Sequence, residues 1–235
     1  MVKTVEAALR DLALPEKAYF YPKFFKAGPG QYAEGDRFLG VVVPDQKKVA
    51  KAFFKDASLE DIGEMLKSPF HEMRLTALFM LNFKFENASV QEREEINAFY
   101  LKNLKYVNNW DLVDSTAYKI LGRYAYESGQ TDLLYGLAVR ENMWEKRVAI
   151  VATMYFLRKK ETLHTKAIAL LNLRHPHDLM HKANGWLLRE MGKLNEEELL
   201  DFLREHYEKL PRTTLRYAIE KFDKERRQQY LKGRF

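Results

Sequence analysis

A helical segment that recurs along the chain constrains its fold more than any other feature. Similar stretches begin at Met73 (MRLTALFMLNF), Val113 (VDSTAYKILGRYA), Lys146 (KRVAIVATMYFLRK), His181 (HKANGWLLREMGK) and Thr213 (TTLRYAIEKF). Each stretch alternates with a further segment whose apolar residues recur at helical spacing. The pattern therefore predicts pairs of helices stacked one after another.

Charged residues at corresponding places give the length of this repeat. Arg74, Asp114, Arg147 and Lys182 follow one another at spacings of 40, 33 and 35 residues. Two-helix repeats of this length are typical of HEAT-like α-solenoids, in which stacked helix pairs form a concave inner face. We therefore predict an all-α fold, an α-solenoid of HEAT-like helical repeats with a concave face.

Hydrophobic spacing predicts helices along nearly the whole chain, and Ser58, Ser89 and Asn195 are candidate N-caps followed by acidic residues. The only candidate strand, FLGVVV at 38–43, is short. No linker or low-complexity tract separates the segments, so residues 1–235 are predicted to form a single HEAT-like repeat domain. The predicted helices lie at 2–13, 16–26, 44–54, 59–67, 70–85, 90–104, 110–126, 132–139, 143–158, 162–173, 176–191, 196–209 and 212–222.

Composition narrows the classes of function. The chain has no cysteine, which excludes disulfides, thiolate metal ligands and a cysteine nucleophile and favours a cytoplasmic location. Its 39 basic and 33 acidic residues give a net charge of +6, which permits a polyanionic partner without requiring one. The longest largely apolar run, residues 148–157, is much shorter than the roughly 20 residues that cross a bilayer, so no membrane association is expected.

The stretch NNWDLVDSTAYKILG carries the first candidate chemistry. Trp110 and Asp114 are four residues apart, so a helix places them on one face, with Asp111 beside them. A carboxylate next to an indole ring can stabilise a cationic transition state. The alternative is structural, because acids near a helix start interact favourably with its dipole and a tryptophan packs in a core.

Two further stretches, NMWEKRVAI and KANGWLLRE, combine tryptophans with cations. Arg147, Lys182 and Arg189 are candidate phosphate contacts, and Trp144 and Trp186 are candidate sugar or base contacts. The alternative is a pair of core tryptophans surrounded by solvated charges. The basic runs at 158–160 and 221–227 likewise fit either a phosphate backbone or solvated helix ends.

Two other motifs are weaker. His177 and His181 in HDLMH resemble the zinc motif H-E-x-x-H, but Asp178 is shorter than the usual Glu and no third ligand is evident. The segment GPGQYA at 28–33 fits a dinucleotide-binding pattern, but no apolar strand precedes it. We therefore predict neither a metal site nor a cofactor.

Several motifs together resemble a known family. FLGV at 38–41 followed by Pro44, the W-D-x-V-D element at Trp110 and the K-A-x-G-W-x-L-R-E element at Lys182 are similar to those of the AlkD-like DNA alkylation repair glycosylases. The resemblance extends from about residue 23 to residue 222, in the same order. It implies a HEAT-like solenoid that hydrolyses the N-glycosidic bond of cationic alkylpurines, such as 3-methyladenine and 7-methylguanine, without a metal or cofactor.

The same resemblance implies roles for individual residues. Trp110 and Trp186 correspond to the family's catalytic-site tryptophans, Asp114 to its catalytic aspartate and Arg147 to its DNA-contacting arginine. With Lys182 and Arg189 as further DNA contacts, these residues are expected on one concave DNA-binding face. The expected partner is double-stranded DNA with alkylated bases, bound by a monomer, with the lesion not drawn into a deep pocket.

The chain also departs from its relatives. Asp178 and Leu179 stand where some relatives carry aromatic residues, and the loop at 28–36 is longer than in some of them. Two other functions on this scaffold stay open at this point. One is a non-catalytic binder of damaged or branched DNA, and the other is a protein-interaction solenoid.

Overall fold

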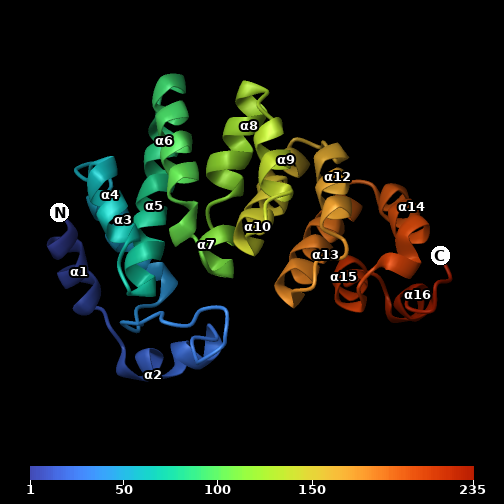
Figure 1. Ribbon diagram of the computed structural model, residues 1–235, viewed down its shortest axis with the longest axis horizontal. Coiled ribbons are helices and arrows are strands. Elements are labelled where there is room, and N and C mark those ends of the chain that lie inside the picture. The colour runs from blue at the N-terminus through green and yellow to red at the C-terminus, as the bar shows by residue number, and fades with distance from the viewer. The chain divides into compact units, whose positions relative to one another are not determined.

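A computed structural model describes residues 1–235, and its regular structure is helical throughout (Figure 1). Arg37 and Phe70 form an isolated β-bridge, and the candidate strand at 38–43 is not formed. The prediction of an all-α, solenoid-like fold is thus confirmed. No helix has the length and apolar character needed to cross a membrane.

The chain divides into two compact units, Met1–Thr116 and Ala117–Phe235. Each unit is built from helices that pack on their neighbours along the chain, as expected of helical repeats. The single-domain organisation and the shared concave face stay predictions.

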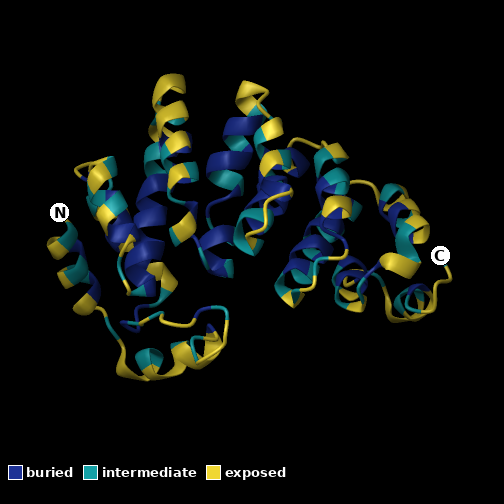
Figure 2. Ribbon diagram, viewed as in Figure 1, coloured by how far each residue is buried: buried dark blue, intermediate teal, exposed yellow.

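The first unit is organised around α5 (His71–Asn87), which packs against α3, α4 and α6. Most of α5 is buried, because its apolar residues cover several faces rather than one stripe (Figure 2). The other elements are α1 (Val2–Arg10), α2 (Pro15–Phe24), α3 (Val43–Phe53), α4 (Leu59–Leu66), α6 (Val90–Lys102), the 3-10 turn η1 (Leu104–Tyr106) and α7 (Trp110–Asp114).

In the second unit α13 (Asp178–Gly192) is the central helix, in contact with α10, α12, α14 and α15. Before it come the π-helical turn η2 (Tyr118–Gly122), α8 (Arg123–Ser128), α9 (Asp132–Ala138), α10 (Met143–Ala152), α11 (Met154–Arg158) and α12 (Leu163–Leu171). After it come α14 (Glu196–His206), the 3-10 turn η3 (Tyr207–Lys209), α15 (Arg212–Ala218) and α16 (Lys224–Tyr230).

All three candidate N-caps are confirmed. Ser58 and Ser89 each form a capping box, in which the serine hydroxyl accepts from the backbone N–H three residues on and the acid there accepts from the serine N–H. The Asn195 side chain accepts from the backbone N–H of Glu198 at the start of α14. These caps satisfy N–H groups that a helix start leaves without partners.

Two long predicted helices are interrupted, and in both a threonine lies near the break. The segment 110–126 is divided into α7, η2 and α8, and Thr116 donates its hydroxyl to the carbonyl of Leu112, 2.6 Å away. The segment 143–158 is divided at Thr153, whose hydroxyl donates to Ile150 at 2.7 Å. Such bonds from side chain to backbone compete with the regular helical ladder.

Helix α16 was not predicted, since the apolar spacing indicates no helix after residue 222. Asp223 caps this helix by accepting from the backbone N–H of Arg226 at 2.9 Å. Tyr230 is its only buried residue, so the segment lacks the apolar periodicity on which the other predictions depended.

Gly185 lets two helices of the second unit approach closely. A Cβ atom at this position of α13 would lie 2.5 Å from the Tyr217 Cβ and 2.6 Å from the Thr214 carbonyl oxygen in α15. No side chain fits there. The glycine of the K-A-x-G-W element is therefore required by helix packing.

Candidate functional site

The first candidate residue, Trp110, begins the short helix α7. The Asn109 side chain caps this start by accepting from the Trp110 backbone N–H at 2.8 Å. The indole stacks on Phe25, with ring centroids 5.6 Å apart and planes 20° apart, and meets the edge of Phe24 at 5.9 Å. Phe25 is buried but Phe24 is 47% exposed, so the Trp110 ring continues into an aromatic surface at the end of α2.

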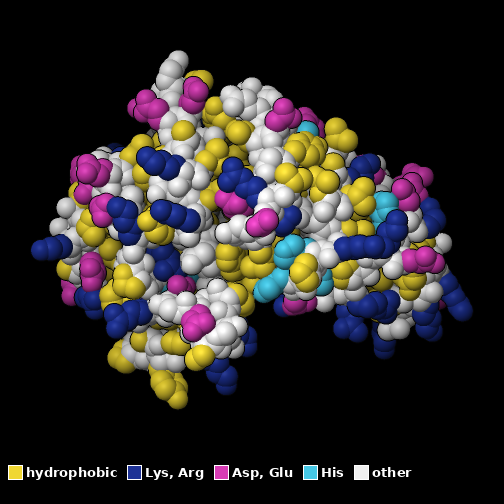
Figure 3. All heavy atoms as spheres, viewed as in Figure 1, with side chains coloured by type: hydrophobic (Ala, Val, Ile, Leu, Met, Phe, Trp, Pro, Cys, Tyr) yellow, Lys and Arg dark blue, Asp and Glu magenta, His cyan; other side chains and the backbone are white.

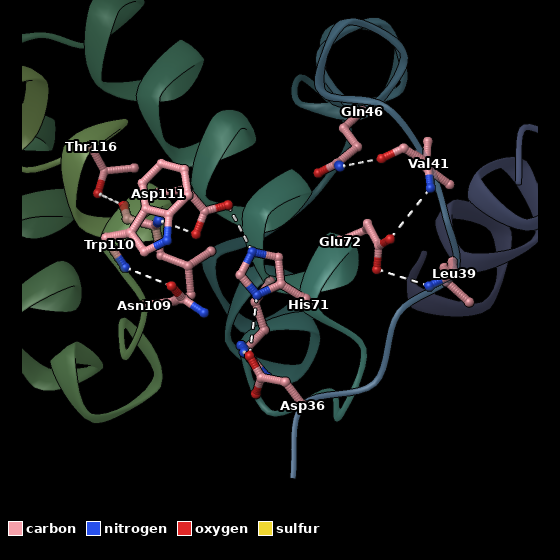
Figure 4. Close-up of polar contacts among 12 residues, drawn as sticks. Asp36, Leu39, Val41, Gln46, His71, Glu72, Asn109, Trp110, Asp111 and Thr116 are labelled. Carbon is pink, nitrogen blue, oxygen red and sulfur yellow. Dashed lines mark hydrogen bonds and ion pairs between the residues drawn. The ribbon is translucent and has the colours of Figure 1, made fainter. Parts of the chain in front are cut away.

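A buried polar network fixes the same end of α7 (Figure 4). The His71 imidazole, at the start of α5, lies between two carboxylates: Nε2 is 2.7 Å from Asp111 and Nδ1 is 3.2 Å from Asp36. Arg74 donates to the same Asp36 oxygen at 2.7 Å. Two acids and two bases thus join the loop before residue 37, the start of α5 and the start of α7.

The network carries charge. Burial by itself lowers the pKa of His71, but the Asp111 carboxylate and the hydrogen bonds to both acids outweigh burial and raise this pKa to about 9. Burial favours a higher pKa for Asp36, but the His71 and Arg74 contacts prevail and hold that pKa below its usual value. At neutral pH the histidine is therefore a cation between acids, which makes α7 an anchored element.

Glu72, next to His71, holds the FLGV segment. Its carboxylate accepts from the backbone N–H groups of Leu39, Gly40 and Val41 at 3.0, 2.8 and 3.3 Å (Figure 4). Gly40 has a φ of +92°, and a Cβ there would lie 2.3 Å from the Leu14 carbonyl oxygen. The motif thus has a structural role: it ties the loop before α3 to the starts of α2 and α5.

Asp114 is the last residue of α7, one turn beyond Trp110. Both side chains are half-buried. Burial raises the pKa of Tyr100, and the charge of Asp114 adds to this rise, while the hydrogen bond between Tyr100 and Thr116 lowers the pKa. The structure therefore places a tryptophan and a carboxylate on one short, anchored helix.

The second unit presents the other candidate residues on α13. Asp178, Lys182, Trp186 and Arg189 follow one another at spacings of four, four and three residues and so share one face. Lys182 is paired with Asp178 at 2.8 Å, and Arg189 is paired with Glu220 of the segment after α15. Trp186 is half-buried. Both predicted DNA-contacting cations of α13 are thus neutralised by acids of the protein.

Arg147 of α10 is buried, and its Nη1 donates to the carbonyl of Leu179 in the first turn of α13, 2.5 Å away. Arg74 makes a similar contact in the first unit, with the Ser68 carbonyl at 3.2 Å. Arginines at corresponding repeat positions thus reach a backbone carbonyl outside their own helix. The contact between Arg147 and DNA stays a prediction.

The histidines of the HDLMH segment have protein partners. His177 caps α13, because its Nδ1 accepts from the Leu179 backbone N–H at 3.1 Å. The Nε2 of His181 lies 2.5 Å from the His175 carbonyl oxygen. No group of three or more potential metal-binding side chains is found, and the predicted absence of a metal stays a prediction.

The residues that sequence reasoning missed are those that hold α7. Asp36 and Asp111 are 35 and 40 residues from His71, so no local motif unites them. The one signal was the FLGV segment, whose anchor Glu72 neighbours His71. The structure brings together Trp110 with Asp114, and Lys182 with Trp186 and Arg189; the convergence of these two groups stays a prediction.

Comparisons with known proteins bear on the family and the fold of this chain. The family model of the DNA alkylation repair enzymes matches residues 5–222. A search among curated proteins finds no match. A solved structure described as a predicted DNA alkylation repair enzyme from Enterococcus faecalis is similar in fold, with a TM-score of 0.68 and 19% identity over 90% of this chain and 97% of that one. With its Trp110 and Lys182 elements inside the matched range, this chain belongs to the DNA alkylation repair enzyme family.

Proposed function

We propose that this chain is a DNA glycosylase that hydrolyses the N-glycosidic bond of cationic alkylated purines, such as 3-methyladenine and 7-methylguanine, in duplex DNA. The observation that carries the proposal is the pairing of Trp110 and Asp114 on α7, a helix whose start is fixed by buried charges. Membership of a DNA alkylation repair family supports the substrate class.

The chemistry needs little from the protein. An alkylated purine with a positive charge is a good leaving group: the bond from C1′ to the purine nitrogen breaks, its electron pair neutralises the purine, and the sugar becomes an oxocarbenium-like cation. Water adds at C1′ and loses a proton. In this proposal the Asp114 carboxylate stabilises the sugar cation and orients the water, as a preorganised charge does most effectively.

The indole of Trp110 has a complementary role. Its ring face attracts positive charge and offers a flat surface to the deoxyribose. The contacts with Phe24 and Phe25 restrict the orientation of the ring, so little entropy is lost when DNA binds. In the second unit, we propose that Trp186 contacts the same duplex.

The phosphate backbone is the proposed partner of Lys182 and Arg189, with Arg147 beside them in the second unit. Because Lys182 and Arg189 now face Asp178 and Glu220, phosphates must compete with these acids. DNA binding should therefore be moderate in strength and dependent on salt. We place this activity in the cytoplasm, in a monomeric protein.

Incubation with methylated duplex DNA tests the proposal. Chromatography should detect free 7-methylguanine and 3-methyladenine released by the purified protein, while a band-shift assay follows binding of the same duplex. Binding without release favours a non-catalytic DNA-binding protein. If the protein neither binds the duplex nor releases a base, both DNA-related functions are contradicted.

A further inference from the structure

Helix α12 is apolar on two opposite sides, which is unusual for a helix at a protein surface. Its inner side buries Thr165, Ile168 and Ala169. Its outer side carries Leu163 and Leu170, seven residues apart, which are 64% and 46% exposed. A surface helix ordinarily has a single apolar stripe, and a second exposed one marks an interaction surface.

A groove of about 530 Å³ runs beside this outer side, between α12 and α14. Its apolar lining comes from Leu163, Ala167 and Leu170 of α12 and from Phe202 of α14. Over α12 and α14, Figure 3 shows hydrophobic side chains next to acidic ones. We call this feature the α12–α14 groove.

The opposite wall of the groove is acidic. Glu197, Asp201 and Glu205 line it and are exposed at successive turns of α14. The single lysine in the lining, Lys166, is paired with Glu198 at 2.5 Å, and of the three acids Asp201 is paired with Arg204 of the same helix at 2.6 Å. In a chain of net charge +6, this wall is locally acidic and repels phosphates.

We propose that the α12–α14 groove binds a basic amphipathic helix of a partner protein. Leucines of that helix would cover the exposed Leu163 and Leu170, as in other complexes where a helix lies in an apolar groove. Lysines or arginines four residues apart would face the three acids, because two helices side by side repeat at the same spacing of about 1.5 Å per residue. The exposed leucines require an apolar face on the partner, and the acids require basic residues beside that face. Together they specify a basic amphipathic helix.

This inference goes beyond the proposed function and does not depend on it. No residue of α13 lines the groove, whereas the proposed DNA contacts Lys182, Trp186 and Arg189 all belong to α13. A partner in the groove therefore leaves these side chains accessible. We expect the helix and DNA to bind the protein at the same time.

Fluorescence anisotropy with two labelled peptides tests the proposal. The probe is a helical peptide of about four turns with leucines on one face and lysines at three successive turns beside them. The control peptide carries glutamates in place of these lysines. The full chain should bind the probe at micromolar concentration and the control peptide at least tenfold more weakly.

Matched variants locate the binding surface. Glu197→Lys with Glu205→Lys, and separately Leu163→Ser with Leu170→Ser, should each weaken probe binding at least tenfold. Glu86→Lys with Glu94→Lys, two exposed acids outside the groove, makes the same change of charge and should leave binding nearly unchanged. All four groove positions are exposed, so circular dichroism should show that these variants remain folded.

Several outcomes would overturn the proposal. The wild type could fail to bind the probe, or it could bind both peptides equally. The groove variants could also bind the probe as tightly as the wild type does. Weaker binding of duplex DNA by the variant with Leu163→Ser and Leu170→Ser would show that the groove belongs to the DNA surface. Self-association of the wild type in sedimentation, abolished by Leu163→Ser with Leu170→Ser, would show that a second copy is the occupant instead.

Discussion

At the scale of single residues, the most informative side chain is His71. It is buried between Asp111 and Asp36, and its charge holds together segments that are distant in sequence. Removing one partner of a buried charge pair is strongly destabilising, because the remaining charge loses its compensation. We therefore assign the rigidity of the start of α7 to this histidine.

His71 makes the stability of the first unit depend on pH. Its pKa is about 9 in the folded protein and 6.5 when unperturbed, so its contribution is complete below pH 6.5 and is lost as the pH rises through 9. We expect the free energy of unfolding to fall by about 3 kcal/mol across this range. Urea titrations followed by circular dichroism at a series of pH values measure it.

The variant His71→Gln isolates this effect, because glutamine donates hydrogen bonds but carries no charge. The decrease between pH 6.5 and 9 should disappear in His71→Gln and persist in His206→Gln, a control on α14. If His71→Gln keeps the same decrease, another group titrates and His71 is neutral in the folded protein.

The acid beside Lys182 gives a second prediction for a single residue. Asp178→Asn removes the negative charge and keeps an oxygen that accepts from Thr213. Because an exposed ion pair contributes about 0.2–1 kcal/mol, we expect duplex DNA to bind up to about fivefold more tightly when Lys182 is released. Fluorescence anisotropy at constant salt measures the change.

Asp201→Asn is the matched control for this change. Asp201 is paired with Arg204 on α14, so this variant alters the net charge equally in another place. Its DNA affinity should stay close to that of the wild type. Equal gains in both variants would mean that overall charge, rather than the α13 face, determines the affinity.

At the scale of elements, most helices could be predicted from apolar spacing and caps, because these signals are local. Ser58, Ser89 and Asn195 mark helix starts correctly. The breaks near Thr116 and at Thr153 could not be predicted, since a threonine hydroxyl bonds to the backbone in some helices and not in others. Nor does the pattern distinguish a buried arginine such as Arg147 from an exposed one.

The crossing of α13 and α15 gives a prediction for an element. Gly185→Ala introduces a Cβ that meets the backbone of α15, so we expect a loss of about 1–3 kcal/mol in the free energy of unfolding. The control is Gly136→Ala in α9, where a Cβ meets nothing within 4 Å and alanine favours a helix. Thermal unfolding compares the two. A stable Gly185→Ala would show that α15 is free to shift.

At the scale of the whole molecule, membership of a DNA repair family suggests DNA as the ligand, and the net charge of +6 permits it. We expect the logarithm of the binding constant to fall linearly with the logarithm of salt concentration, by about 0.9 for each phosphate contact. Band shifts on unrelated duplexes should give nearly equal affinities. A binding constant that does not change with salt concentration would contradict a role for the phosphate backbone.

The same plot tests Arg147. Arg147→Ala should make its slope shallower by about 0.9 if the arginine exchanges the Leu179 carbonyl for a phosphate. An unchanged slope, with weaker binding to all duplexes, would show that Arg147 only holds the start of α13.

The candidate site could be predicted in part. Spacing on one helix indicated Trp110 with Asp114, and the resemblance supplied their proposed roles. The network at His71 could not be predicted, because it joins residues far apart in sequence. Candidate catalytic residues that lie close together in the sequence can thus be predicted from it. The contacts that hold them in place can be identified only in the folded structure.

The central claim is that Asp114 stabilises a sugar cation, and single-turnover release of 7-methylguanine at matched DNA occupancy tests it most directly. Asp114→Asn keeps the size of the side chain and removes its charge, so release should slow about 10- to 1000-fold while DNA affinity is kept. Asp132→Asn, an exposed acid in the first turn of α9, should release the base at the wild-type rate. Equal rates for wild type and Asp114→Asn would contradict the catalytic assignment.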